Sequence, residues 1–263
     1  MGICKDASTQ YLRDVGYNVV RLPRDFLPPL SLIGQQNKTF EYVGGIEDLI
    51  TNSPGPLPQI TSGQNASSIN GQRTSSMKLS IGLSILNGLI AGLGGGKIGA
   101  TASFTNARKL TFEFNNVTFD SVVPTQVGKW LRDGEVDAGN PLLEQYVLGN
   151  GSLYVVTERL RTAELTTAFE ASDGVNASVD VPVIANQVGG SLGVELASGR
   201  TNAVKFKGPG PVTFGFKCFQ IGVVDGEITM LSVKPGKVVA SVENNSDESE
   251  VLSEGMLDID AAQ

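Results

Sequence analysis

Few residues in this chain could perform covalent chemistry. The chain contains no histidine, which excludes the common serine–histidine triads and histidine-ligated zinc. Ser75-Ser76-Met77-Lys78 matches the S-x-x-K pattern of some serine hydrolases. The companion Lys-Thr-Gly is absent, however, and Ser172-Asp173-Gly174 is only a loose match to Ser-Asp-Asn. A hydrolase that uses Ser75 or Ser76 with Lys78 is therefore the weaker alternative, and we expect the protein not to be an enzyme.

The glycine run that ends at Lys97 is not a phosphate-binding loop. Position 91 is alanine where that loop needs glycine, and Ile98 occupies the position that requires Ser or Thr. We therefore expect no nucleotide, no metal and no cofactor. The chain carries 20 basic and 27 acidic residues, and we expect no nucleic acid partner.

The two cysteines have different surroundings. Cys4 stands beside a predicted short helix over 6–15, where it could carry a lipid or be a small buried hydrophobic residue. Cys218 lies among the phenylalanines at 214, 216 and 219 and is predicted to be a core residue. The two thiols could pair, but in a reducing compartment we expect them to stay reduced.

Neither a membrane helix nor a signal peptide is predicted. No segment approaches the roughly 20 apolar residues that a membrane helix needs. Charged residues interrupt the first 20 positions, at Lys5, Asp6, Arg13 and Asp14. We therefore expect the protein to be made as a soluble cytoplasmic protein.

Residues 77–114 fit two kinds of secondary structure. Residues 79–93 show a helical stripe with steps of four and three residues, and residues 79–85 also alternate as a strand would. After Gly94-Gly95-Gly96 the chain alternates again, and Leu110, Phe112 and Phe114 continue the pattern. We predict a convertible membrane hairpin here. Its apolar face would consist of Leu79, Ile81, Leu83, Ile85, Ile98, Ala100, Ala102 and Phe104.

A second, weaker hairpin of the same kind is predicted over 153–206. Residues 154–171 favour a helix by composition, yet alternate from Ala163 onwards. The alternation resumes after an Asp173-Gly174 turn and changes parity from Val188, which would require a bulge near 185–187. Pro182 counts against a central strand. The predicted apolar face consists of Leu165, Phe169, Val175, Val179, Val181 and Val183.

Two such hairpins favour an oligomeric β-barrel. Each predicted strand exceeds the roughly 9–11 residues that cross a bilayer. A single hairpin cannot span lipid, because the backbone N–H and C=O groups at its edges would have no partner. We therefore expect a homo-oligomer in the membrane, and a form in water that packs both hairpins against its own body.

The C-terminal region carries the whole formal net charge of −7. After Lys237 there are seven acidic residues and no basic one, so residues 1–237 hold 20 of each. A solvating, disordered tail is one interpretation. The alternative is a polar linker over 241–250, open to proteolysis, followed by a peptide over 251–263 that docks on the body. The docking residues would be Val251, Leu252, Met256, Leu257 and Ile259.

The remaining pattern indicates the α+β class. Strands are predicted over 17–22 and 40–43, and a hairpin joins 212–223 to 227–233 across Asp225-Gly226. Helices are predicted over 124–133 and over 141–148, the latter with Asn140 as its cap. A helical turn is predicted over 45–51 and a loop over 53–76.

The N-terminal residues resemble a known family. Met1-Gly2-Ile3-Cys4-Lys5-Asp6, with Tyr17-Asn18-Val19-Val20-Arg21-Leu22-Pro23, is similar to the start of bacterial gasdermins, and the resemblance covers the whole chain. It implies a twisted, mostly antiparallel sheet with surrounding short helices. It also implies a pore-forming domain over 1–240, a cleavable linker over 241–250 and an autoinhibitory peptide over 251–263.

The resemblance further implies a mechanism. A caspase-like or related protease would remove the peptide from an inactive cytoplasmic monomer, and the body would oligomerise into a pore in the inner (plasma) membrane and kill the cell in anti-phage defence. It implies a palmitoyl group on Cys4 and lipids as partners. The alternative is a cytoplasmic lipid-anchored binding module with a partner-docking acidic tail. We place the cleavage loop at Glu243, Asn244, Asn245, Ser246, Asp247 and Glu248.

Overall fold

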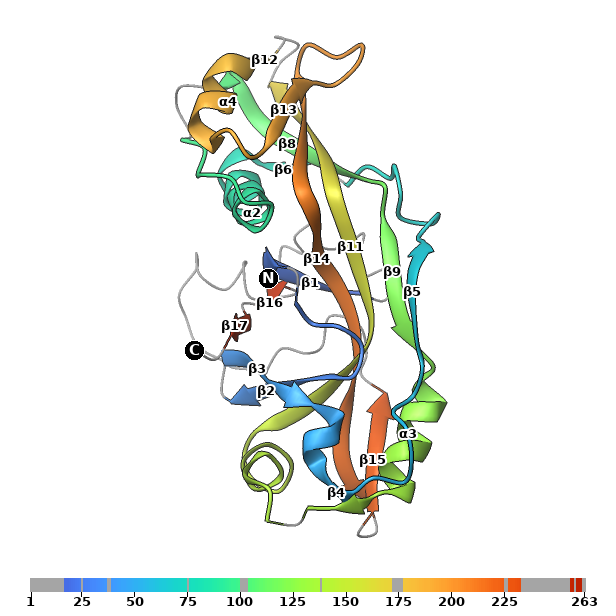
Figure 1. The fold of residues 1–263 in the computed structure, drawn as a ribbon. Coiled ribbons are helices and arrows are strands. Elements are labelled where there is room, and N and C mark those ends of the chain that lie inside the picture. Colours follow the sequence, from blue (N-terminus) through green and yellow to red (C-terminus); the bar gives the residue numbers. More distant parts are fainter. Residues whose placement is uncertain are drawn as a thin grey trace.

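The computed structural model confirms an α+β fold built on a mostly antiparallel sheet (Figure 1). The structure describes residues 17–24, 26–36, 39–74, 76–99, 104–137, 139–171, 177–224, 227–232, 256–257 and 259–261. The predicted helix over 6–15 lies outside these residues.

Two long strands form the centre of the sheet, and we call them the central pair. They are β11 (Ser152–Ala171) and β14 (Ala203–Val224), antiparallel along almost their whole length. Shorter strands flank them in three sections. The outer edge of β11 pairs in turn with β2 (Ser31–Gln36), β9 (Thr118–Val122) and β8 (Ala107–Asn115). The outer edge of β14 pairs in turn with β15 (Glu227–Ser232), β1 (Asn18–Arg24) and β13 (Gly193–Leu196).

The three sections (lower, middle and upper in Figure 1) meet where the register of the central pair shifts. The first shift lies between Val156 and Glu158, where β11 changes its outer partner from β2 to β9. A second shift lies between Leu160 and Arg161, inside the middle section, and a third lies between Thr162 and Glu164, which pair with Val212 and Lys207. Residues 208–211 (Gly-Pro-Gly-Pro) are the extra residues of β14 at this point. Because proline has no N–H group and bulges bend strands, the sheet can change direction between sections.

The remaining elements are short. Their bounds are β3 (Thr39–Gly45), η1 (Ile46–Leu49), β4 (Ile50–Asn52), β5 (Ile60–Asn65), β6 (Met77–Lys78), α2 (Leu79–Gly92), β7 (Phe104–Thr105), α3 (Pro124–Asp133), β10 (Glu135–Val136), η2 (Leu143–Val147), β12 (Ser178–Val179), α4 (Val181–Val188), β16 (Met256–Leu257) and β17 (Ile259–Ala261).

Several elements match the predictions from sequence. The strands over 17–22 and 40–43, the helix over 124–133 and the β14–β15 hairpin are confirmed. Asn140 acts as the predicted cap, because its Oδ1 accepts a hydrogen bond from Leu142 N at 2.8 Å. The prediction of a continuous loop over 53–76 is wrong, because β5 pairs with β9 there. All six side chains of β5 are exposed, so no apolar alternation could have indicated it.

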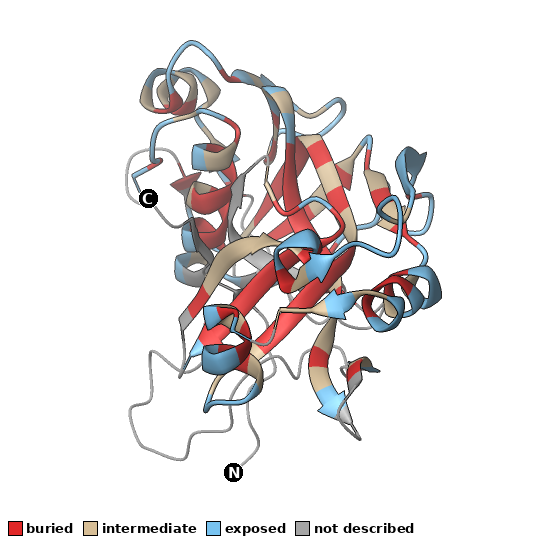
Figure 2. Ribbon diagram, turned by 60° about the horizontal axis from the view of Figure 1, so that its bottom comes forward, coloured by how far each residue is buried: buried red, intermediate tan, exposed pale blue. Residues whose placement is uncertain are grey.

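The buried side chains form three clusters along the sheet. In Figure 2 the long strands of the sheet are coloured mostly as buried. The upper core lies between α2 and the upper sheet and extends to Tyr17. The lower core surrounds Trp130 of α3. The middle core is smaller and contains Phe40, Phe216 and Cys218. The two segments predicted to enter a membrane therefore belong mainly to the upper core.

Candidate membrane-inserting segments and the C-terminal strands

The first candidate segment is helical at its start. The helical interpretation of residues 79–93 holds in this structure, because α2 buries its stripe in the upper core and the extended alternative is not adopted here. A Cβ atom on Gly82 would lie 2.4 Å from Leu110 Cγ, so only glycine permits this close approach of α2 to β8. Four positions of the predicted face lie in this helix, namely Leu79, Ile81, Leu83 and Ile85.

The return leg of this segment is strand only in part. Ile98 is buried in the upper core, but residues 95–99 form no strand. Phe104 begins β7, and its ring stacks on that of Phe169 with centroids 4.2 Å apart. Ala100 and Ala102 lie outside the described residues. The predicted continuous strand from Lys97 to Thr105 is therefore wrong for this state over 97–99.

The second candidate segment differs from its prediction. Leu165 and Phe169 are buried on β11, and Val179 of β12 pairs with Phe104. Val181 and Val183 lie in α4 rather than in a strand, which corrects the prediction. Val175 lies outside the described residues.

The end of α4 nearest β12 explains this correction. Asp180 Oδ1 accepts a hydrogen bond from Val183 N at 3.0 Å, and Pro182 occupies the first turn, where its missing N–H costs nothing. The helix also replaces the bulge that was predicted near 185–187.

The two candidate segments hold each other in place. Gly96 N donates to Val188 O at 2.7 Å, and Gly99 N donates to Gln187 Oε1 at 3.0 Å. Ser191 Oγ donates to Gly94 O at 2.9 Å. These hydrogen bonds join the loop after α2 to α4 and its following turn. Neither segment can become fully extended while they persist.

A polar contact inside the first segment fixes the same loop. Asn87 Nδ2 donates to Ile98 O at 3.2 Å, and Ile98 N donates to Asn87 Oδ1 at 2.7 Å. One side chain thus satisfies both backbone groups of a residue that has no strand or helix partner. The contact closes residues 87–98 into a compact unit above the sheet.

Buried charges fasten the middle section. Asp120 Oδ2 lies 2.7 Å from Arg159 Nε and 3.6 Å from Arg161 Nη1, and Gly63 N donates to Asp120 Oδ1 at 2.8 Å. The Asp120 side chain is only 3% exposed. Burial alone would raise its pKa, but the Gly63 N–H and the two guanidinium groups outweigh burial and hold the pKa below its ordinary value. Sequence reasoning missed this group because its members are distant in the chain.

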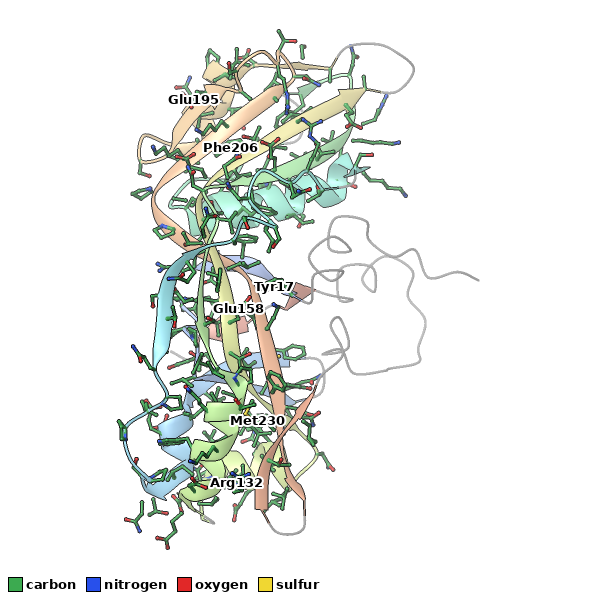
Figure 3. All side chains as sticks on the ribbon, turned by 90° about the vertical axis from the view of Figure 1, so that its right-hand side faces the viewer. Tyr17, Arg132, Glu158, Glu195, Phe206 and Met230 are labelled. Carbon is green, nitrogen blue, oxygen red and sulfur yellow. The ribbon has the colours of Figure 1, made fainter. Side chains whose placement is uncertain are left out.

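The start of β1 is attached to the same section. Tyr17 Oη donates a hydrogen bond to Glu158 Oε1 of β11, and Figure 3 shows the two residues next to each other in the middle section. Lys217 Nζ lies 3.2 Å from the same Glu158 oxygen and 4.2 Å from the centre of the Tyr17 ring. Tyr17, which directly precedes β1, therefore adds side-chain contacts to the strand pairing that joins β1 to β14.

A second charged group lies where the middle and upper sections meet. Glu164 accepts from Lys205 Nζ at 3.0 Å, from Lys207 Nζ at 3.3 Å and from Asn116 Nδ2 at 3.0 Å. Burial acts to raise the pKa of Glu164, but the two lysines hold it below its ordinary value. This carboxylate joins β11 to β14 directly beside the Gly208–Pro211 irregularity.

Two C-terminal strands pair with the body. β16 runs parallel to β1, with Val19 opposite Met256 and Val20 opposite Leu257. β17 runs parallel to β3, with Ile259, Asp260 and Ala261 opposite residues 40–42. Three predicted docking residues, Met256, Leu257 and Ile259, therefore lie in strands on the body. That these strands keep the protein inactive stays a prediction.

The other predicted sites lie outside the part of the chain that the structure describes. These are Cys4, Val251, Leu252 and the loop residues Glu243, Asn244, Asn245, Ser246, Asp247 and Glu248. Ser75 of the hydrolase alternative is also outside it, while Lys78 lies opposite Lys109 between β6 and β8. Among the described residues, no three His, Cys, Asp or Glu side chains gather as metal ligands would. Burial raises the pKa of Cys218 to about 12, as befits the core residue that was predicted.

Comparison with known proteins identifies the family. Residues 20–228 match the family model described as Bacterial Gasdermin Family. Gasdermin bGSDM from Vitiosangium sp. (strain GDMCC 1.1324) is 46% identical to the chain over 265 residues, which cover 99% of each protein. The chain belongs to the bacterial gasdermin family. A second gasdermin, from a Desulfuromonadales bacterium, is 31% identical over 229 residues, or 87% of this chain and 86% of the relative.

The gasdermin fold is also found by structure. A bacterial gasdermin from Bradyrhizobium tropiciagri superimposes with a TM-score of 0.63 at 13% identity, covering 98% of this chain and 97% of that one. Gasdermins form membrane pores and are not an enzyme family, so membership supports a general role as a pore-forming effector. Within the described residues, no helix has both the length and the apolar character needed to cross a membrane.

Proposed function

We propose that this gasdermin is an autoinhibited pore-forming effector that proteolysis activates. Cleavage within the linker over 241–250 releases residues 251–263, and the body then oligomerises into a membrane β-barrel. The observation that carries this proposal is the packing of both candidate segments into one core. They are joined to each other by Gly96–Val188 and by the β7–β12 pair, so that opening one frees the other.

The physical reason for conversion lies in residues 79–92. They form a helix here, yet their first part carries the alternation of an amphipathic strand. In water, the upper core shields their apolar side chains. In lipid, the same apolar side chains can be exposed, but each backbone N–H and C=O group needs a hydrogen-bond partner. Strands that pair with strands of neighbouring copies would supply these partners.

The proposal includes a lipid anchor and a location. A palmitoyl group on Cys4 would add about 0.8 kcal/mol of membrane affinity per buried methylene. The inactive monomer would reside in the cytoplasm and the pore in the inner (plasma) membrane. A caspase-like or related protease would act as the trigger, and death of the infected cell would protect its neighbours from phage.

Dye leakage from liposomes tests the central step. A recognition site for a sequence-specific protease is inserted between residues 243 and 250 of the full chain. We expect leakage after cleavage and none before it. The matched control carries the same insertion with its cleavable bond mutated, and it should stay silent when protease is added. Absence of leakage from fully cleaved chain would refute pore formation.

The lipid anchor is tested separately. Intact mass of the chain from its native host should exceed the sequence mass by one palmitoyl group, and Cys4→Ala should remove that excess. An unmodified mass for the wild-type chain would reject the anchor without affecting the leakage result.

A further inference from the structure

The C-terminal strands cover two different edges of one sheet. The pairing order in the lower and middle sections is β16-β1-β14-β11-β2-β3-β17. β16 ends at Leu257 and β17 begins at Ile259, so one residue separates the two ends of this series. Figure 1 draws both strands beside the N-terminal ones. The peptide thereby connects the two ends of this strand series within one chain. Its removal exposes the outer edges of β1 and β3 at the same time.

The strand directions make these two edges complementary. Each step from β1 through β14, β11 and β2 to β3 is antiparallel, so that four steps leave β1 and β3 running the same way. β16 is parallel to β1, and β17 is parallel to β3. On the outer edge of β1, the peptide therefore occupies the position that a strand running in the same direction as β3 could occupy. On the outer edge of β3, it occupies the position that a strand running in the same direction as β1 could occupy.

We propose that, after the peptide leaves, the outer edge of β1 pairs in parallel with the outer edge of β3 of a second copy of this chain. The inference rests on the proposed release of the peptide. An uncovered strand edge is a template for pairing, because its N–H and C=O groups lack partners. Only a repeated copy offers a matching edge at each end. Such a contact is head-to-tail, so successive copies form a ring when the rotation closes.

Other uncovered edges suit this role less well. Among the described strands β5 pairs only with β9, so its other edge is already open in the uncut chain and release of the peptide does not change it. β13 has four residues and an exposed Glu195, and charges on short edge strands protect an edge from pairing. The inner edge of β1 pairs with β14 and the inner edge of β3 pairs with β2. Both strands therefore remain in the body when the peptide is gone.

Disulfide trapping tests the contact. Neighbouring strands lie about 4.7–4.9 Å apart, within the roughly 4.4–6.8 Å between Cα atoms that a disulfide accepts. One batch of full chain carries Val20→Cys and a second carries Glu41→Cys, each with the protease site in the linker. Because side chains alternate between faces, the test is repeated with Arg21→Cys and Tyr42→Cys, which keep the same parallel register. The batches are mixed on liposomes, cleaved and oxidised.

We expect a covalent dimer only when the β1 and β3 variants are mixed and cleaved. A chain with both substitutions should give a ladder of higher oligomers. The control pair, Gln64→Cys on β5 with Glu195→Cys on β13, should give neither product. Dimers of a single variant at the level of the mixed dimer, or no mixed dimer above the control pair, would overturn the proposal.

The leakage assay on the same samples separates this inference from the proposed function. Leakage without the mixed dimer refutes the strand contact and leaves pore formation intact. Absence of leakage with the mixed dimer refutes the pore and supports the contact, while absence of both refutes both. Hydrogen exchange on wild-type chain avoids any folding defect of the variants. Amides 19–20 and 40–42 should stay as protected in the cleaved oligomer as in the uncut chain, and their loss of protection would contradict the contact.

Discussion

Replacing Asn87 with alanine should make the cleaved protein permeabilise membranes faster. The Asn87 side chain satisfies both backbone groups of Ile98, at 3.2 and 2.7 Å, and the Ile98 side chain is only 3% exposed. A net hydrogen bond contributes about 0.5–1.5 kcal/mol, and water can reach this partly exposed loop after the change. We therefore expect the inactive state to lose about 1–2 kcal/mol.

That loss sets the size of the expected effect. If residues 79–99 leave the upper core before the slowest step, the barrier falls by the same amount and leakage accelerates about 5- to 30-fold. Initial rates of dye release after complete cleavage measure it, and urea unfolding of the uncut chain measures the loss of stability. Ser84→Ala is the matched control, because Ser84 lies exposed on the same helix.

One result would refute this reasoning. If Asn87→Ala lowers the free energy of unfolding by the expected amount while leakage proceeds at the rate of wild type and of Ser84→Ala, residues 87–98 do not open before the slowest step.

Four further predictions concern the body. Asp120→Ala leaves two guanidinium groups without their buried carboxylate and should destabilise the chain by about 3–5 kcal/mol in urea unfolding, whereas Glu195→Ala, at a side chain 68% exposed, should cost less than about 1 kcal/mol. Because the folded pKa of Asp120 lies below its ordinary 3.8, its contribution is complete above that pH and disappears as the pH falls through the folded value. The stability gap between wild type and Asp120→Asn should therefore narrow in acid, and a gap independent of pH would contradict the assignment. Gly82→Ala should cost about 1–2 kcal/mol despite the higher helix propensity of alanine, because the buried Leu110 side chain must move, and an unchanged unfolding midpoint would count against close packing. Iodoacetamide at pH 8 should label Cys218 slowly in native chain and readily in urea, because burial raises its pKa to about 12; equal rates would place the thiol at the surface.

Local signals in the sequence predicted the elements that local forces decide. The Asp225-Gly226 dipeptide predicted the β14–β15 hairpin, and Asn140 predicted the helical segment that follows it. The start of α4 also carries a local signal, because Asp180 caps the helix and Pro182 lies in its first turn, although the alternation of apolar residues there predicts a strand. The cap favours the helix in this segment, because the first N–H groups of a helix have no partner within the helix and a capping side chain supplies one.

Other features depend on residues that are distant in the sequence. No apolar pattern marks β5, which is held by its pairing with β9 and by the bond from Gly63 N to Asp120. The extension of β14 through Gly208–Pro211 was not predicted, because prolines argue against a strand and the long partner β11 overrides them. The charged groups around Asp120 and Glu164 become visible only once the register of the central pair is known.

The position of β16 and β17 in the chain has a consequence for synthesis. All of their partner strands, and every strand of the body, precede them. At about 5–20 residues per second, the ribosome adds the segment between Ser232 and Ala261 in about 1–6 s. During those seconds each newborn molecule already has β1 and β3 but not the strands that will lie on them. If this peptide keeps the protein inactive, as we propose, every newly translated copy passes through a short interval without that inhibition, before any protease acts.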